Sequence, residues 1–425
     1  MDTFIKEKYE TWLNETTLTQ IEKTELINLE EKEVVDRFSA DLEFGTAGIR
    51  GVMGMGTNRM NIYIVRQATQ GLAEYLNSQN NESTVAIAYD SRNNSSTFAK
   101  ETARVLAANG IKVFIYKTLM PVPALSFAVR ELKCTAGIVI TASHNPKQYN
   151  GYKVYGSDGC QMTPEAANAV LANIRKIDIF KGIKNSSFTI EMQNGNICYI
   201  SDEIVKNYYN SVLSQSILSE EASPRILKLT YTPLHGAGLV PVTTVLEMDG
   251  FESIDIVEEQ KLPDGDFTTC PYPNPEIKEA MQLGIDLMLK NGNDVSIATD
   301  PDSDRAGVAV NHRGVPIILT GNEIGILLFD FIYQARIQEN KMPENAIVVK
   351  TIVSSDLVNL MASKYNVKVV DVLTGFKYIG EQIHLLEEIN HVERFLLGFE
   401  ESCGYLTNPA VRDKDAVNAM LLIAE

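Results

Sequence analysis

Two loops of this sequence, far apart along the chain, carry residues suited to phosphoryl transfer. In residues 141–146 (TASHNP), Ser143 and His144 follow the apolar run 136–140, which predicts a short buried strand. A serine just past such a strand lies where open α/β sheets bind their ligands. An isolated Ser-His pair is more often part of an ordinary loop. The pair therefore indicates a site only together with the acidic residues 300–305.

The acidic segment, residues 300–305 (DPDSDR), places Asp300, Asp302 and Asp304 at alternate positions after the apolar run 295–299. Carboxylates this close repel one another unless a cation lies among them. Ligation by oxygen alone suits Mg²⁺, and the spacing does not fit an EF-hand. A solvated acidic turn is the alternative. The following residue, Arg305, could offer two parallel N–H donors to a phosphate.

A phosphoryl group on Ser143 would connect the two loops. It would add a charge of about −1.5 to −2. Beside three aspartates this charge is tolerable only with the metal, which can bind a phosphoryl oxygen. Ser143 is therefore predicted to be both the nucleophile and a metal ligand. His144 is expected to hydrogen-bond the phosphoserine or orient the loop, because no G-x-S-x-G motif surrounds Ser143.

A third polar loop, residues 398–402 (GFEES), could recognise a sugar. Glu400 and Ser402 are two positions apart and would point the same way on an extended segment. Their acceptor and donor groups suit adjacent sugar hydroxyls. Glu401 is expected to face away.

Together these motifs resemble those of the α-D-phosphohexomutases, and most closely phosphoglucomutase/phosphomannomutase. The resemblance runs over nearly the whole chain, and four motifs in the family's order are far more specific than any one alone. The segments that carry it are 44–51 (FGTAGIRG), 141–146, 300–305 and 398–402. It implies a mutase that interconverts glucose 1-phosphate and glucose 6-phosphate, with mannose phosphates as second substrates. It also implies Mg²⁺, a phosphoserine and a sugar 1,6-bisphosphate activator.

The resemblance also assigns roles to three basic residues. Arg50 matches the position whose guanidinium faces the transferring phosphate, and Lys414 matches one that contacts the sugar phosphate. The family's general acid/base falls on Lys153. A surface lysine is the ordinary interpretation, but repulsion from Arg50 and Arg305 would lower its basicity and allow proton transfer near neutral pH.

The substrate-binding residues follow the same correspondence. Glu400 and Ser402 match the family's sugar-specificity loop, and Arg305 and Lys414 are expected to bind phosphate. Thr374 and Gly375, next to Lys377, are further candidates for substrate binding.

Two other functions stay open at this point. Residues 231–236 (YTPLHG) resemble the branch of the family with phosphopentomutases and sugar-bisphosphate synthases. The chain could also be a noncatalytic phosphosugar-binding protein, although Ser143 and the aspartates argue against that. His235 lacks a hydrolase serine nearby and is predicted to be structural.

Apolar periodicity predicts an α/β fold of three successive, similar α/β domains facing one central cleft. In each domain a polar loop follows the third strand. The predicted third strands are residues 136–140, 295–299 and 395–397. The expected domains are 1–204 (phosphoserine), 205–315 (metal binding) and 316–425 (sugar recognition). Residues 2–40 are expected to form amphipathic helices with Trp12, Leu18, Ile21 and Leu26 among their core contacts.

Bulk properties exclude several classes of protein. The chain has 425 residues, and its 38 basic and 55 acidic side chains give a net charge of −17, which disfavours nonspecific nucleic-acid binding. Its five cysteines form no C-x-x-C pair. No signal-peptide core or membrane-length apolar run is present. We therefore expect a cytoplasmic protein with no membrane or nucleic-acid partner, of undetermined oligomeric state.

The sequence departs from the family at its C-terminal end. The family's fourth domain, which carries a phosphate-gripping loop of Arg, Ser, Gly and Thr, does not appear before Glu425. The third domain is expected to be cut within its last helix. Such a chain is expected to keep the serine and metal loops and to grip the substrate phosphate more weakly.

Overall fold

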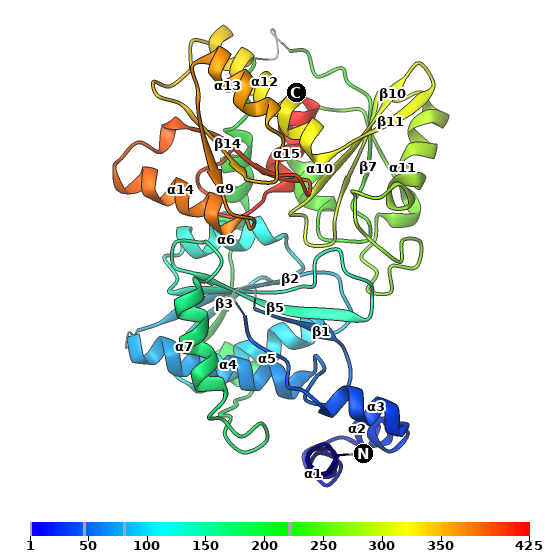
Figure 1. Cartoon of the computed structure of the whole chain (residues 1–425), viewed down its shortest axis with the longest axis vertical. Coiled ribbons are helices and arrows are strands. Elements are labelled where there is room, and N and C mark those ends of the chain that lie inside the picture. Colours follow the sequence, from blue (N-terminus) through cyan, green and yellow to red (C-terminus); the bar gives the residue numbers. More distant parts are fainter. Residues whose placement is uncertain (1, 46–47, 80–81, 220–222) are drawn as a thin grey trace.

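Three β-sheets, each covered by helices, make up most of the molecule (Figure 1). The computed structural model describes residues 2–45, 48–79, 82–219 and 223–425. Thr46 and Ala47 of the 44–51 motif therefore lie outside the described residues. Among the described residues, no helix combines the length and the apolar character needed to cross a membrane.

The first sheet has six strands in the order β1-β5-β4-β2-β3-β6. β2, β3, β4 and β6 run parallel, whereas β5 is antiparallel to both β4 and β1. Its strands are β1 (Ile49–Val52), β2 (Thr84–Tyr89), β3 (Lys112–Ile115), β4 (Ala136–Ile140), β5 (Tyr149–Gly156) and β6 (Ile197–Tyr199). The helices of this unit are α4 (Ile62–Gln79), α5 (Ser95–Ala108), α6 (Val122–Glu131), α7 (Pro164–Ile174) and α8 (Phe188–Gln193).

The second sheet has five strands in the order β11-β10-β9-β7-β8. Its strands are β7 (Leu229–Thr232), β8 (Ile254–Ile256), β9 (Val295–Thr299), β10 (Ala306–His312) and β11 (Val315–Leu319). The accompanying helices are α9 (Asp202–Leu213), α10 (Leu239–Met248), the short 3₁₀ helix Glu258–Gln260 and α11 (Lys278–Asn291). Apolar residues from Ile226 onward suggest a strand that begins there, but β7 begins only at Leu229 and Ile226 is 81% exposed.

The third sheet has four strands in the order β13-β12-β14-β15. Its strands are β12 (Ile347–Thr351), β13 (Lys368–Val372), β14 (Phe395–Glu400) and β15 (Gly404–Leu406). Its helices are α12 (Gly321–Gln338), α13 (Leu357–Tyr365), α14 (Lys377–Glu388), the 3₁₀ helix Val392–Arg394 and α15 (Ala416–Ala424).

The three sheets repeat one arrangement of four strands. The orders β5-β4-β2-β3, β10-β9-β7-β8 and β15-β14-β12-β13 have the same relative sequence. In each, the third parallel strand turns into an antiparallel neighbour. Residues 141–146 and 300–305 lie at this turn, and the 398–402 segment enters it after β14 ends at Glu400. The sequence predicted the three successive α/β units and the strand before each loop, but not the antiparallel strand after it.

Helix α15 connects the second and third units. It packs against α9, α10, β10 and β15, and eight of its nine residues are buried. The second and third units thus share one hydrophobic core, which also includes Phe127 of α6. The first sheet has a separate core on its other face. The acidic loop is therefore held between elements that pack together, which fixes its position relative to the serine loop.

The N-terminal helices α1 (Thr3–Leu13), α2 (Gln20–Ile27) and α3 (Glu31–Phe38) pack on the first unit through an aromatic cluster. The Trp12 ring lies 5.6 Å from that of Tyr63 and 5.1 Å from that of Phe180. Leu26 is buried as predicted, but the prediction for Ile21 is wrong, because its side chain is 83% exposed. These two residues point to opposite sides of α2, since five positions on a helix rotate a side chain by about 140°.

Candidate active site

The serine loop (residues 141–146) and the acidic loop (residues 300–305) meet directly. Ser143 Oγ donates a 2.7 Å hydrogen bond to Asp300 Oδ2. Thr141 Oγ1 donates to Asp302 Oδ2 at 3.1 Å, and the Val122 N–H donates to the Asp302 carbonyl at 2.9 Å. The first sheet therefore presents its serine to the second sheet's carboxylates.

The third unit contacts the acidic loop from another side. Arg305 forms an isolated β-bridge with Gly404, and the Ala306 N–H donates to the Cys403 carbonyl at 3.0 Å. The Ala416 N–H at the start of α15 donates to the Ser303 carbonyl at 3.2 Å. Ser303 has a positive φ of 53°. The acidic loop of the second unit thus makes backbone hydrogen bonds with both the first and the third unit.

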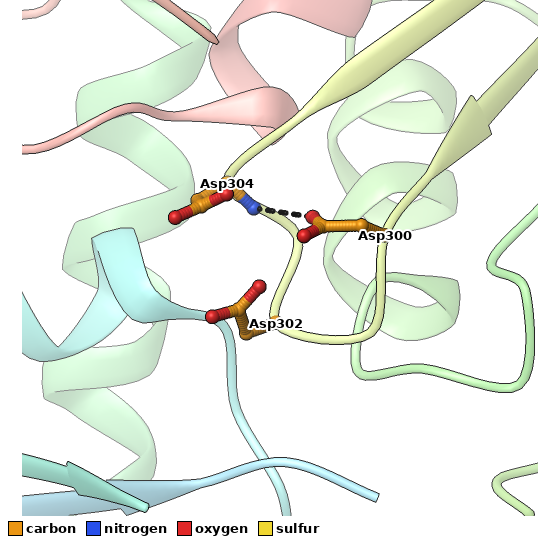
Figure 2. Close-up of side chains that lie close together, drawn as sticks. All are labelled: Asp300, Asp302 and Asp304. Atoms are coloured by element: carbon orange, nitrogen blue, oxygen red, sulfur yellow. Dashed lines mark hydrogen bonds between the residues drawn. The ribbon is translucent and has the colours of Figure 1, made fainter. Parts of the chain in front are cut away.

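The three aspartates of the acidic loop face one another (Figure 2). One oxygen from each of Asp300, Asp302 and Asp304 lies within 4.8 Å of the others, and all three residues are buried. In the described part of the chain, Asp302 Oδ1 and Asp304 Oδ1 have no hydrogen-bond partner. Buried carboxylate oxygens without partners are costly unless a cation satisfies them. This group could bind a metal ion, and its all-oxygen character suits a hard divalent cation.

The charges of the aspartates are set by burial and by their neighbours. Burial, with the carboxylates of Asp302 and Asp304, raises the pKa of Asp300 well above its ordinary value. At Asp302 burial would also raise the pKa, but the ammonium groups of Lys153 and Lys414 and the hydrogen bond with Asp300 together outweigh it, and the pKa lies below its ordinary value. Three adjacent carboxylates thus cannot all be charged without compensating cations.

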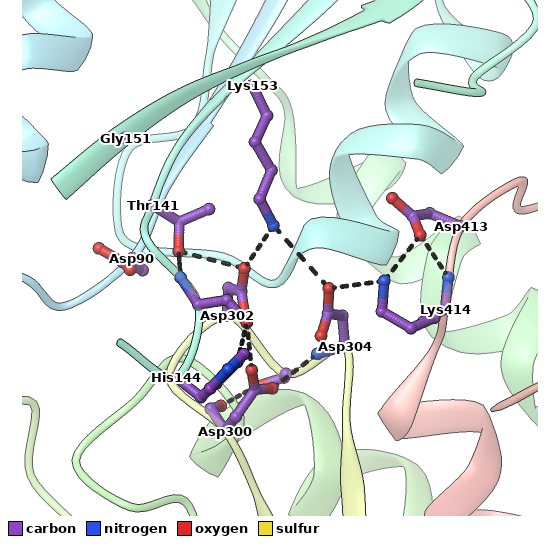
Figure 3. A network of polar contacts seen from close by, with 12 residues as sticks. Asp90, Thr141, His144, Gly151, Lys153, Asp300, Asp302, Asp304, Asp413 and Lys414 are labelled. Carbon is purple, nitrogen blue, oxygen red and sulfur yellow. Dashed lines mark hydrogen bonds and ion pairs between the residues drawn. The ribbon is translucent and has the colours of Figure 1, made fainter. Parts of the chain in front are cut away.

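Two lysines supply part of that compensation (Figure 3). Lys153 Nζ on β5 lies 3.0 Å from Asp302 Oδ2 and 3.9 Å from Asp304 Oδ2. Lys414 Nζ lies 3.2 Å from Asp304 Oδ2 and 3.3 Å from Asp413 Oδ1. Burial would lower the pKa of Lys414, but the three carboxylates of Asp304, Asp413 and Glu400 raise it. The partners of Lys153 seen here are carboxylates rather than the arginines expected from the sequence.

The serine loop holds Ser143 in an unusual conformation. Ser143 has a φ of 52°, in the left-handed region. Its N–H donates to Thr141 Oγ1 at 2.8 Å, and its Oγ lies 3.3 Å from His144 Nδ1. Burial and the positive charge of Arg305 lower the pKa of His144 to about 3, so the ring is neutral near pH 7. A neutral ring can donate or accept a hydrogen bond without adding charge.

The two predicted phosphate-binding arginines have different surroundings. Arg50 on β1 is exposed, and its Nη1 donates to Asn145 Oδ1 of the serine loop at 3.0 Å. The Arg305 guanidinium forms an ion pair with Glu276, and in the described chain its buried Nε has no hydrogen-bond partner. Glu276 was not predicted from the sequence. It orients Arg305 while leaving one donor group for another acceptor.

The predicted sugar-binding residues lie at the ends of third-unit strands. Glu400 Oε1 accepts a 3.0 Å hydrogen bond from the Gly375 N–H, which joins two of these candidates. Thr374 is exposed and Ser402 is partly exposed, so both remain accessible. Glu401 Oε2 instead accepts from Thr351 Oγ1 at 3.0 Å. Glu400 and Glu401 thus have different partners, as their adjacent positions on an extended segment suggest.

Arg92 and Asp90, at the end of β2, were not predicted to belong to the site. The side chain of Arg92 is fully buried, and its Nη1 donates to the Pro146 carbonyl of the serine loop at 3.0 Å. Asp90 is paired with Arg92 and lies beside the same loop (Figure 3). A sequence signal existed, since β2 and β4 are parallel neighbours and parallel strands deliver their C-terminal residues to one edge of the sheet.

Comparison with known families gives matches along most of the chain. Residues 41–180, 206–314 and 320–425 match the models of phosphoglucomutase/phosphomannomutase alpha/beta/alpha domains I, II and III, respectively. The three matched segments contain the serine loop, the acidic loop and the 398–402 loop in that order.

Individual relatives agree with these matches. The chain is 40% identical over 391 residues to a phosphoglucomutase of Staphylococcus saprophyticus, covering 91% of this chain and 69% of that protein. A Staphylococcus aureus phosphoglucomutase is 38% identical over 393 residues, with 91% and 68% covered. A solved structure from Thermus thermophilus, assigned as a phosphomannomutase, superposes with a TM-score of 0.75 at 24% identity, covering 91% of this chain and 79% of that one. The similarity to the Thermus thermophilus structure, at this level of identity, shows only that the two chains share a fold.

Proposed function

Since the chain belongs to the phosphoglucomutase/phosphomannomutase family and is a phosphohexose mutase, we propose that it interconverts glucose 1-phosphate and glucose 6-phosphate through a phosphorylated Ser143. The 2.7 Å contact between Ser143 Oγ and Asp300 Oδ2 carries this proposal. It brings a hydroxyl nucleophile to a group of carboxylates that could hold a cation. The glucose substrate is supported by the names of the two staphylococcal relatives.

We propose Mg²⁺ as the metal, held by Asp300, Asp302 and Asp304 together with an oxygen of the group on Ser143. The buried oxygens Asp302 Oδ1 and Asp304 Oδ1, which have no hydrogen-bond partner in the described chain, support this assignment. When bound, such an ion withdraws negative charge from a phosphoryl group during transfer. The aspartates would hold the ion, and Ser143 would provide the group on which it acts.

In the first half-reaction the phosphoryl group moves from Ser143 Oγ to the 6-hydroxyl oxygen of glucose 1-phosphate. The bond between phosphorus and Oγ breaks, and a bond between phosphorus and O6 forms. We assign the proton transfer to Lys153, which donates a proton to Ser143 Oγ and recovers one from the sugar hydroxyl. Its carboxylate partners hold the ammonium group in the cleft.

The second half-reaction reverses these bonds at the other end of the sugar. The glucose 1,6-bisphosphate turns within the cleft, and its C1 phosphoryl group returns to Ser143, leaving glucose 6-phosphate. Glucose 1,6-bisphosphate added from solution would load Ser143 and so act as the activator. Mannose phosphates are proposed as second substrates.

The sugar and its phosphate would be recognised by residues of all three units. We assign the sugar hydroxyls to Glu400, Ser402 and the Thr374–Gly375 turn. His144 would hydrogen-bond the phosphoserine. The phosphate groups are assigned to three cations: Arg50, Arg305 and Lys414. The corresponding domains would be 1–204 for phosphoserine chemistry, 205–315 for metal binding and 316–425 for sugar recognition. A cytoplasmic location stays a prediction.

A coupled assay with Ser143→Ala tests the proposal. It would follow glucose 6-phosphate formation with Mg²⁺ and a trace of glucose 1,6-bisphosphate. Wild type and the control Ser157→Ala, an exposed serine of the same unit, should turn over, whereas Ser143→Ala should not. Turnover by Ser143→Ala would rule out the phosphoserine route. Faster turnover of ribose 1-phosphate than of glucose 1-phosphate would assign the chain to the phosphopentomutase branch.

A further inference from the structure

The Arg92 guanidinium holds the backbone of the serine loop through hydrogen bonds to carbonyl oxygens in the loop and in the adjacent strand β5. Its Nη1 donates to the carbonyl oxygens of Pro146 at 3.0 Å and Tyr149 at 3.1 Å. Its Nη2 donates to the carbonyl oxygens of Ser143 and Asn145. One guanidinium thus serves four carbonyls, including that of the proposed nucleophile itself. The planar guanidinium carries five N–H donors in a fixed geometry and can bind four carbonyls at once, whereas a lysine ammonium cannot.

The clamp has its own support in the first unit. Asp90 Oδ2 lies 3.3 Å from Arg92 Nε, and both side chains are fully buried. Asp90 Oδ1 accepts hydrogen bonds from the Arg92 N–H at 2.9 Å and from Ser95 Oγ at 2.6 Å. This contact pairs the two charges without a hydrogen bond, since neither Arg92 Nε nor Asp90 Oδ2 has a hydrogen-bond partner among the described residues. A buried guanidinium is stable only when its charge is paired. Asp90 therefore keeps Arg92 charged and oriented toward the loop.

The second unit also contacts the Arg92 guanidinium. The Arg92 guanidinium lies 4.9 Å from the ring centroid of Phe267, which is fully buried. Phe267 belongs to the 261–270 loop, which also meets the first unit where Asn93 Nδ2 donates to Asp266 Oδ1 at 3.3 Å. His235 holds this loop through Nε2 with Thr269 Oγ1 at 2.8 Å and through Nδ1 with the Leu262 carbonyl at 3.1 Å. A chain of contacts thus runs from His235, which follows β7, through the 261–270 loop and Arg92 to the serine loop.

The conformation of Ser143 explains why such a clamp is needed. A non-glycine residue in the left-handed region is strained and persists only where its surroundings enforce it. We propose that Arg92 is a positioning residue for Ser143, and that Asp90 and Phe267 hold its guanidinium so that the serine Oγ points at the acidic loop. This inference rests on the proposed role of Ser143 as the phosphoryl carrier.

Arg225 provides a matched control for Arg92. Its side chain is 4% exposed, its Nε lies 2.7 Å from Asp249 Oδ2, and its guanidinium lies 5.6 Å from the Phe251 ring. It also donates to two backbone carbonyls, those of Ser223 and Leu218. Its environment thus resembles that of Arg92, but the carbonyls it binds are not those of the serine loop. Arg→Lys at either position removes the fork and keeps the charge.

The test compares Arg92→Lys with Arg225→Lys in the full chain, at temperatures where both are folded. For Arg92→Lys we expect kcat to fall about 10²-fold, because small displacements of reacting groups cost that much. KM should stay within about two-fold, since the sugar-binding groups are untouched. Arg225→Lys should lower the unfolding temperature while kcat per folded molecule stays at the wild-type value. Equal kcat values for the two variants would overturn the inference.

A second variant and a direct readout complete the test. Phe267→Leu leaves every hydrogen bond of Arg92 in place but removes the ring beneath it. It should lower kcat by about three- to ten-fold, and a wild-type kcat would contradict the proposal even if Arg92→Lys failed to fold. The rate of Ser143 phosphorylation by glucose 1,6-bisphosphate distinguishes a failure of the proposed function from a failure of the positioning role of Arg92. No phosphate on wild-type Ser143 refutes the proposed function, whereas equal rates in wild type and Arg92→Lys refute only the positioning role.

Discussion

Ser143 Oγ and Asp300 Oδ2 are 2.7 Å apart, although 157 positions separate the two residues in the chain. The contact arises because the first and second sheets each turn from their third parallel strand into an antiparallel one at the same place. The two turns face each other across the boundary between the units. The repetition of one supersecondary arrangement thus creates a site that neither unit contains alone.

The proposed role of Lys153 as the proton carrier can be tested without breaking its ion pairs. Lys153→Arg keeps a positive charge beside Asp302 and Asp304, but a guanidinium does not release its proton in proteins. We expect kcat to fall by about 10²–10⁴-fold, the usual contribution of a general acid/base. Steady-state kinetics with glucose 1-phosphate would measure this. The exposed Lys112→Arg is the control, and an unchanged kcat for Lys153→Arg would move the role to another group.

Metal binding by the aspartates should be visible without any assay of activity. Mg²⁺ at about 100 times its Kd should stabilise the wild-type protein by about 2.7 kcal/mol and raise its thermal unfolding midpoint. Asp304→Asn should lose most of that rise, because one of the three buried carboxylates is neutralised. The exposed Asp286→Asn of α11 should keep it. An identical Mg²⁺ effect in both variants would exclude the aspartate site.

An ion-pair cluster joins the first and third units near the site. The Arg412 side chain is fully buried, and its Nη2 lies 2.8 Å from Glu387 Oε2. Glu387 Oε1 also lies 2.7 Å from Arg130 Nη2. Glu387→Ala would leave a buried guanidinium without its partner, so we expect a loss of about 1–3 kcal/mol in unfolding free energy, discounted because Glu387 is 43% exposed. Urea unfolding would measure this loss, and Glu388→Ala, an exposed neighbour, should stay within about 0.5 kcal/mol of wild type.

Asp415 makes the stability of the fold depend on pH. Burial raises its pKa to about 7 from an ordinary value of 3.8. The folded state therefore binds a proton that the unfolded state has released, and this contribution to stability is lost as pH rises from about 4 to about 7. Because of Asp415, we expect the unfolding free energy to fall by about 2 kcal/mol as the pH rises from 5.5 to 7.5.

Asp415→Asn isolates that contribution. Asparagine can still accept the hydrogen bonds that Asp415 Oδ1 receives from the Asn418 N–H and Tyr208 OH. The pH dependence of unfolding in urea should therefore be smaller in the variant, while Asp2→Asn, at the exposed N-cap of α1, should follow wild type. A pH dependence shared by all three proteins would show that Asp415 titrates normally.

Much of the site could be predicted because its residues lie at strand ends. Ser143 and the three aspartates each follow a short, apolar, buried strand, a pattern that periodicity detects well. Glu400 lies at the end of such a strand in the third sheet. The repeated strand-helix periodicity then predicted three similar units, each with its loop after the third strand.

Other contacts could not be predicted because they depend on how the units pack. Strand β5 was missed because it is buried on both faces and carries Asn150 and Lys153, so it has no polar alternation. Arg92, Phe267 and Glu276 each act on a loop of another strand or unit, and no local pattern reveals such a partner. The exposure of Ile21 follows from where α2 begins, which the capping box of Thr19 and Glu22 determines.

The most direct test of the account is to locate the transferred phosphoryl group. The protein would be incubated with Mg²⁺ and glucose 1,6-bisphosphate, digested, and mapped by tandem mass spectrometry. We predict one phosphate per chain on Ser143, lost on addition of excess glucose 1-phosphate as the bisphosphate forms. Turnover of glucose 1-phosphate with no phosphate on Ser143, or with phosphate on a different residue, would contradict the account.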